Sequence, residues 1–270
     1  MTVENKVWSR LGLGLALTSA AFLGACGGEA GGEADEGAGA SIEVAEAAGE
    51  VGDGEAGEGG EGEGGEGGET GHDMSTMPIE NRVAFMSGHV QAGLALYKAG
   101  APDQAAPHLL HPVSETHAEE RAGIDALGFD QSLFEAVSAA LEEGKPASEI
   151  EPLLEAAQAN ISLLMTNAGG DPANVIAFLM DTVVEEYQIG VTDGLITDPG
   201  EYQDAFGFVV TALEIAESVE GDTATRVISE LETLLAMWPD EGPLAASTPS
   251  AVSPIVAQTS RVHLALNDLN

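Results

Sequence analysis

Three of the six histidines in this 270-residue chain lie within one short segment, PHLLHPVSETH. His108 and His111 are three residues apart, a spacing that places both imidazoles on one face of a helix. We expect Pro112 to end this helix, so that Glu115 and His117 follow in a turn. Imidazole nitrogens bind zinc, copper, iron and nickel, and carboxylates supply compensating charge. The segment therefore predicts a site for a divalent transition-metal ion.

Another histidine, His89, lies beside Phe85 at the edge of the apolar face of an expected helix. It is either a further ligand of the same site or a partly buried imidazole that is hydrogen-bonded to a carboxylate. The remaining two, His72 and His263, are expected to be solvated or to cap helices. The preferred metal ligands are His108, His111 and Glu115, followed by His117 and His89.

Two Glu-Tyr pairs flank a turn at Asp193 and Gly194. The turn makes the flanking helices antiparallel, so the two pairs are expected to converge near it. Helical bundles build iron sites from carboxylates on facing helices. In the alternative, the tyrosines only bury their rings, and Glu201 only complements a helix dipole. The residues of this second candidate metal site are Glu186, Tyr187, Glu201, Tyr202 and Asp204.

The first 25 residues have the order of parts of a secretory signal. Lys6 and Arg10 precede the apolar run LGLGLALTSAAFL, which is shorter than the roughly 20 residues that span a bilayer. The LGAC sequence that ends at Cys26 resembles a bacterial lipobox. The resemblance implies that Cys26 is lipidated and begins the mature protein, and that Gly27 directs it to the outer membrane.

Composition divides the rest of the chain into two parts. Residues 26–72 are rich in Gly and Glu, and such a stretch cannot bury enough apolar surface to fold. We expect a disordered acidic tether. Residues 73–270 are long enough for one domain with a hydrophobic core.

The domain shows helical periodicity nearly throughout, with few aromatic residues and no alternating strand pattern. Short connections favour an all-α, antiparallel helical bundle. A Pro- and Ser-rich link at about 239–254 precedes a last helix from about Ile255 to Leu266. The other expected helices cover 78–100, 103–111, 114–127, 130–144, 147–169, 171–190, 200–221 and 222–238.

The formal net charge of −38 limits the binding partners. A strongly acidic protein repels nucleic acid and anionic lipid head groups and attracts cations. The sequence contains no nucleophile elbow, phosphate-binding loop or HExxH motif. We therefore expect a binding protein that is not an enzyme.

The segment EEYQIGVTDGLITDPGEYQDAFGFV resembles the helical extracytoplasmic domain of some bacterial high-affinity iron permeases. The segment GHVQAGLALYKAGAPDQAAPHLLHPVSETH resembles bacterial periplasmic proteins that carry the same domain. Together the resemblance covers Gly88 to Val209 most clearly. It implies an all-helical periplasmic domain that handles metal, with iron favoured over copper or zinc. A permease also has transmembrane helices and a glutamate-rich membrane motif, so here we expect capture, sensing or delivery of the ion.

Three interpretations thus remain open for a lipid-anchored protein in the cell envelope. The weakest is an enzyme, for which a His and carboxylate metal site with an open position is the only catalytic route. In the first, it binds metal and works with an envelope transport protein. In the second, it is a non-catalytic scaffold for another envelope protein, and its histidines are structural. The scaffold would dock through exposed apolar residues of the last helix, namely Val262, Leu264 and Leu266.

Overall fold

The computed structural model describes residues 76–114, 123–219, 224–240 and 242–269. This part of the chain is helical almost throughout, which confirms the all-α prediction. The predicted signal peptide, the lipidated Cys26 and the acidic tether lie outside the described residues. The helices are α1 (Ile79–Lys98), α2 (Pro102–Ser114), α4 (Gln131–Glu142), α5 (Ala147–Ala168), α6 (Pro172–Gly190), α7 (Pro199–Ser218), α8 (Thr225–Leu235), α9 (Val252–Ala265) and the 3₁₀ turn η2 (Leu266–Asp268).

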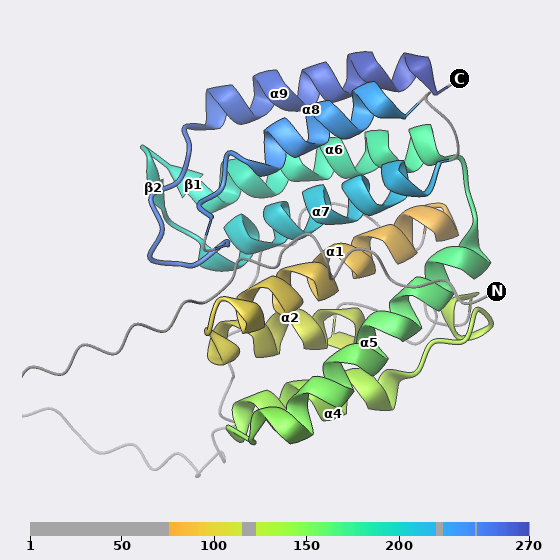
Figure 1. The fold of residues 1–270 in the computed structure, drawn as a ribbon, viewed down its shortest axis with the longest axis vertical. Helices are drawn as coiled ribbons and strands as arrows, with labels where there is room; N and C mark the ends of the chain where they lie inside the picture. The colour runs from red at the N-terminus through yellow and green to blue at the C-terminus, as the bar shows by residue number, and fades with distance from the viewer. Residues whose placement is uncertain (1–75, 115–122, 220–223, 241, 270) are drawn as a thin grey trace, which may run out of the picture. The chain divides into compact units, whose positions relative to one another are not determined.

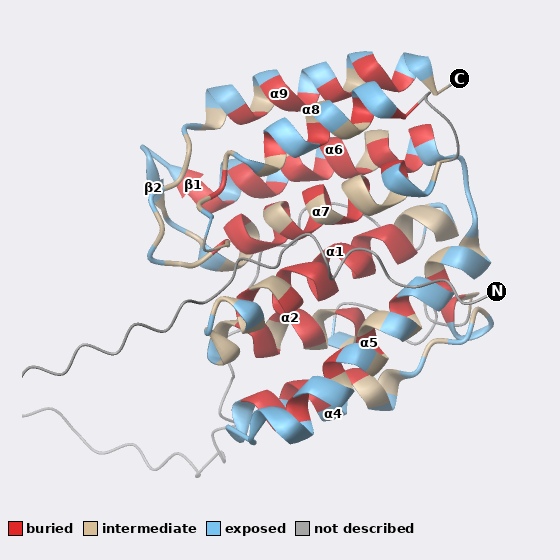
Figure 2. Ribbon diagram, in the orientation of Figure 1, coloured by how far each residue is buried: buried red, intermediate tan, exposed pale blue. Residues whose placement is uncertain are grey.

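The helices form two closed groups of four (Figure 1). In one group, α6 packs on α7, α7 on α8, α8 on α9, and α9 back on α6. In the other, α1 packs on α2, α2 on α4, α4 on α5, and α5 back on α1. Each group has its own cluster of buried apolar residues. The two groups meet where α1 lies against α7 and α6, and Figure 2 shows buried residues along these facing helices.

A short hairpin joins α6 to α7. Its strands, β1 (Val191–Thr192) and β2 (Leu195–Ile196), pair antiparallel. The turn residues Asp193 and Gly194 both have positive φ, at 53° and 76°, as a tight two-residue hairpin turn requires. A Cβ added at Gly190 would lie 2.6 Å from the Tyr202 nitrogen. The predicted turn is therefore present, and it folds the end of α6 closely against the start of α7.

Two expectations about helix boundaries need correction. Helix α2 does not end before Pro112 but continues to Ser114, because a proline in the final turn removes only one helical hydrogen bond. The last helix begins at Val252, earlier than predicted. Asp171, by contrast, caps α6 by accepting a hydrogen bond from the Asn174 nitrogen.

The predicted docking stripe on the last helix is wrong. Val262 and Leu266 are buried in the core of the α6 to α9 group. Only Leu264 is exposed, with 62% of its surface accessible. An amphipathic helix that closes a four-helix group uses its apolar face inside that group, so this face is not available to another protein.

Helices α1 and α7 approach each other unusually closely. A Cβ added at Gly207 would lie 2.0 Å from the Gly88 carbonyl oxygen and 2.8 Å from the Ala92 nitrogen. A Cβ at Gly88 would meet the ring of Phe208 at 2.0 Å. Only glycine allows this backbone contact. The crossing fixes which side chains of the two helices face one another.

Polar side chains line the same contact farther along the helices. The Thr211 hydroxyl donates to the Ser87 hydroxyl, and the Gln91 amide donates to the Glu214 carboxylate at 2.9 Å. Burial raises the pKa of Glu214 to about 7, although the nearby Lys98 opposes this shift. An ordinary glutamate is ionised well below that pH.

We therefore expect Glu214→Gln to stabilise the protein above neutral pH. As pH rises from about 4.5, Glu214 loses its proton first in the unfolded chain, so the free energy of unfolding of the natural protein falls until about pH 7. The free energy of unfolding of the variant does not fall in this way, because glutamine does not ionise. At pH 8 the variant should therefore be more stable than the natural protein by about 2 kcal/mol. Urea unfolding at pH 4.5 and pH 8 measures the difference. Equal stability of the two proteins at both pH values would contradict it.

Candidate metal centre

Four side chains from three helices converge at the contact between the two helical groups. His89 comes from α1, His108 and His111 come from α2, and Asp204 comes from α7. One ligand atom from each residue can be chosen so that all four lie within 4.8 Å of one another. This is the only set of three or more histidines, cysteines and acids that meets this condition among the described residues.

The ring nitrogens surround the carboxylate of Asp204. The Nδ1 atoms of His89 and His108 each lie 2.8 Å from Asp204 Oδ1. His111 Nδ1 lies 3.1 Å from His89 Nδ1 and 3.9 Å from Asp204 Oδ2. Ligands of one metal ion, each bound at about 2.0 to 2.2 Å, are separated by similar distances. Three nitrogens and one carboxylate are a donor set that suits zinc, copper, iron or nickel.

A chain of hydrogen bonds orients His108. The Ala245 nitrogen donates to Gln104 Oε1, which also accepts from Gln203 Nε2. This contact turns Gln203 Oε1 toward His108, where it accepts from Nε2 at 2.8 Å. With the hydrogen held on Nε2, Nδ1 is the nitrogen that points at Asp204 and that would bind an ion. Histidines that bind metals are commonly held in this way through their other nitrogen.

Both nitrogens of His108 face acceptors, an arrangement that favours the protonated ring when no ion is bound. Burial alone would lower the pKa of His108, but the carboxylate of Asp204 and the hydrogen bonds from the ring outweigh burial and raise it. Burial would likewise raise the pKa of Asp204, yet His108 and His89 hold it well below its usual range. A cation bound at Nδ1 would replace the proton there and meet a fully ionised carboxylate.

The centre is largely shielded from solvent. The side chains of His108, Asp204 and His89 expose 1%, 4% and 5% of their surfaces, while that of His111 exposes 14%. The rings of Phe85 and Phe208 pack edge-on against His89, with centroids 4.6 Å and 5.4 Å away. Apolar walls strengthen the electrostatic attraction between the centre and a cation. His111 marks the side nearest to solvent.

Two carboxylates lie next to this centre. Glu186 of α6 and Glu201 of α7 share a hydrogen bond, and both interact electrostatically with Asp204 and His89. Glu186 is only 2% exposed, and its Oε2 atom has no hydrogen-bond partner among the described residues. Burial, with the neighbouring Glu201, raises the pKa of Glu186 to about 10. The sequence placed these acids in a separate second site, but they adjoin the histidines.

The two tyrosines of that second site belong to an aromatic cluster. The Tyr187 hydroxyl donates to the Ser250 carbonyl at 2.8 Å. The Tyr187 ring lies 5.8 Å from that of Tyr202 and 5.2 Å from that of Trp238, between centroids. The Tyr187 hydroxyl is therefore engaged away from the carboxylates. Both rings are buried, and the Tyr202 hydroxyl has no hydrogen-bond partner among the described residues.

The structure thus brings some of the predicted ligands close together. His89, His108 and His111 lie together, and Asp204 joins them from the second predicted site; the contact of buried His89 with the Asp204 carboxylate fits both interpretations of that histidine. Glu115 and His117 lie outside the described residues. Sequence analysis did not identify Gln203 as a partner of His108. Gln203 is 95 residues away from His108 in the sequence. The only sequence signal for its role was its position next to Asp204.

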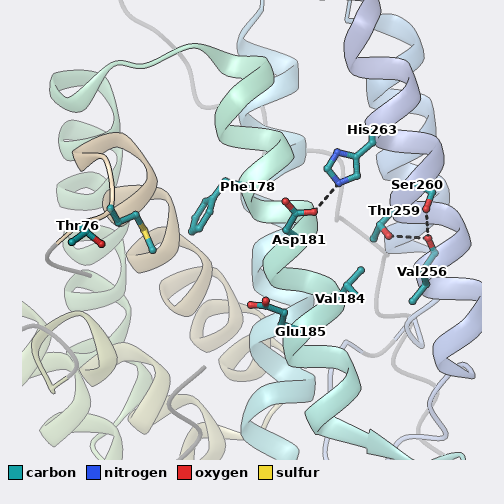
Figure 3. Close-up of a pocket in the computed structure, with 10 residues that line it drawn as sticks. Thr76, Phe178, Asp181, Val184, Glu185, Val256, Thr259, Ser260 and His263 are labelled. Carbon is teal, nitrogen blue, oxygen red and sulfur yellow. Dashed lines mark hydrogen bonds and ion pairs between the residues drawn. The ribbon is translucent and has the colours of Figure 1, made fainter. Parts of the chain in front are cut away.

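A separate open pocket of about 760 Å³ lies between α6 and α9 (Figure 3). Its lining includes Asp181 and Glu185 of α6 and His263 of α9. The Asp181 carboxylate lies 3.2 Å from His263 Nε2. The three histidines of the metal centre do not line this pocket, so it is a distinct feature of the surface.

Residues 170–265 match the model of the iron permease-associated 4-helix bundle domain. The match covers α6 to α9, which form one of the two helical groups, and the chain therefore contains a helical domain related to iron permeases. No curated protein and no solved structure matches the chain significantly. Within the match lie Asp204, Glu186 and Glu201, whereas the three histidines of the centre come from α1 and α2. No described helix is both long and apolar enough to cross a membrane.

Proposed function

We propose that the protein binds a transition-metal ion through His89, His108, His111 and Asp204. The convergence of three Nδ1 atoms on one buried, ionised carboxylate carries this proposal. The orientation of His108 by Gln203 supports it, because a merely structural histidine needs no such control of its Nδ1 atom. In this role the ion is the cargo of the protein, and the protein is not an enzyme.

Iron is the favoured cargo. Histidine and carboxylate ligands suit iron, copper and zinc alike, so the donor set leaves all three as candidates. The likeness of residues 170–265 to a domain associated with iron permeases supports iron among them. The ion would then be captured, sensed or delivered in partnership with an envelope transport protein. The lipobox-like sequence at Cys26 supports a lipid anchor, with the domain on the periplasmic face of the outer membrane.

Thermal unfolding of the full chain tests this function. After treatment with a chelator, we expect one of Fe(II), Fe(III), Cu(II) or Zn(II) to raise the melting midpoint by several degrees. An ion at about 100 times its dissociation constant stabilises the native state by roughly 2.7 kcal/mol. The variant with His108→Ala and His111→Ala should lose this rise, because it lacks two of the four ligands.

His263→Ala is the matched control, since it removes a histidine that pairs with Asp181 on another helix. This variant should keep the full response to the metal. If no metal shifts the midpoint of the natural chain, or if the double variant responds as the natural chain does, the proposed function is wrong.

A further inference from the structure

We propose that Glu186 and Glu201 form a second cation site beside the histidine centre, so that the domain binds two ions per chain. This inference rests on the proposed function, because it extends the same centre. The two sites differ in their ligand atoms. The histidine centre offers mainly nitrogen, whereas the second site offers carboxylate oxygen. Carboxylate oxygen suits hard cations such as Mn(II) and iron.

Packing explains why the two glutamates face each other. Glu186 lies near the end of α6 and Glu201 lies in the first turn of α7. The tight turn at Asp193 and Gly194 reverses the chain between them, and the small Gly190 lets the two helices touch. Two acids from different helices are thereby held within hydrogen-bonding distance.

The state of Glu186 points to a missing partner. Its Oε2 atom is buried and has no hydrogen bond from any described residue, although buried polar atoms are almost always satisfied. The two carboxylates lie close to a third, that of Asp204. Among the described residues, no lysine or arginine forms an ion pair or hydrogen bond with any of these three carboxylates. Either the two glutamates share a proton or a cation lies between them.

A cation is the occupant that the surroundings favour. The acids are not isolated, because both interact electrostatically with His89 and Asp204, which are ligands of the proposed histidine centre. Carboxylates contributed by facing helices next to histidines form the paired metal sites of many helical bundles. A shared proton joins one oxygen of each carboxylate and leaves Glu186 Oε2 without a partner, whereas an ion bound by both oxygens of Glu186 would satisfy that atom as well.

The experiment is equilibrium dialysis of the full chain against Mn(II) and against Fe(II) without oxygen, followed by metal analysis. The comparison is with Glu186→Gln, with Glu186→Gln and Glu201→Gln together, and with the control Glu185→Gln. Glu185 is the exposed neighbour of Glu186 on α6, so its loss controls for weak binding by surface acids. We expect two tightly bound ions in the natural chain and in the control, and one in both variants of the site.

The stability of the variants without metal provides a second readout. Glu186→Gln should raise the melting midpoint of the metal-free protein by several degrees, because the amide removes a carboxyl that is costly to ionise in the fold. The same variant should gain less from added metal than the natural chain does. The stabilising effect of the substitution therefore shrinks when metal is added, which a purely structural glutamate would not produce.

The outcomes separate the two proposals. One ion in the natural chain and one in the variants would overturn the second site and leave the histidine centre intact. No tightly bound Mn(II) or Fe(II) in the natural chain would overturn the second site, whereas the histidine centre is tested separately by the melting response that includes Cu(II) and Zn(II). Two ions in the natural chain and in every glutamate variant would place the second ion elsewhere and would also overturn this inference.

Discussion

Asp204→Asn should abolish tight metal binding. Asp204 is the one carboxylate of the centre, and it contacts the Nδ1 atoms of His89 and His108 at 2.8 Å each. The amide removes the negative charge that balances the cation and turns an N–H donor toward the bound ion or the rings. Loss of even an outer partner of a ligand weakens metal binding by about 10 to 100-fold, so we expect loss of this ligand to cost at least about 100-fold. Calorimetric titration with the metal measures the change.

The same variant should also be less stable without metal. Breaking a buried pair by removing one partner leaves the other charge uncompensated and costs about 3 to 5 kcal/mol. Here the charged ring of His108 would lose its counterion. Asp193→Asn is the control, because Asp193 is an exposed turn residue with φ of 53°, a conformation that asparagine tolerates well. An unchanged affinity in Asp204→Asn would show that this carboxylate is not a ligand.

Gly207→Ala should destabilise the whole domain. The added Cβ would lie 2.0 Å from a carbonyl oxygen and 2.8 Å from a backbone nitrogen of α1, and no side-chain rotation can relieve a clash with backbone. Overpacking usually costs 1 to 3 kcal/mol and sometimes more, so we expect a loss of about 3 kcal/mol or more. Metal affinity should fall as well, because Asp204 lies one turn away on the helix that must move.

Gly93→Ala provides a graded comparison for this effect. Its new Cβ would lie 2.7 Å from Cγ of the buried Leu109 side chain and 3.1 Å from a backbone atom, Ala105 O. The Leu109 side chain can adjust, so the loss should be clearly smaller. Urea unfolding of both variants measures the two values. Equal losses would show that the close contact of α1 and α7 is not the cause.

Local sequence patterns were sufficient to predict most of the described helices, while most of the expected helix 114–127 lies outside the described residues. The expected ranges 171–190 and 200–221 correspond to α6 at Pro172–Gly190 and α7 at Pro199–Ser218. The signals used were local: helical periodicity, capping residues and a two-residue turn. The pairing of the helices into two groups of four was not predicted, because it depends on which apolar faces meet across long stretches of chain.

The candidate metal centre was predicted only in part, because it also depends on contacts between distant parts of the chain. Residue type and spacing identified His108 and His111, and the apolar pattern around His89 left it as a further candidate. Asp204 was assigned to another site because 115 residues separate it from His89. What brings them together is the contact of Gly88 with Gly207, and a glycine in a helix pattern does not reveal its neighbour in another helix.

The position of the centre between two separately packed cores has a mechanical consequence. All three histidines belong to the α1, α2, α4 and α5 group, while Asp204 belongs to the α6 to α9 group. A bound ion would therefore link the two groups of helices, each of which has its own hydrophobic core. The loaded and empty forms would then differ in how firmly the two groups hold together, and a partner protein can distinguish them without touching the ion.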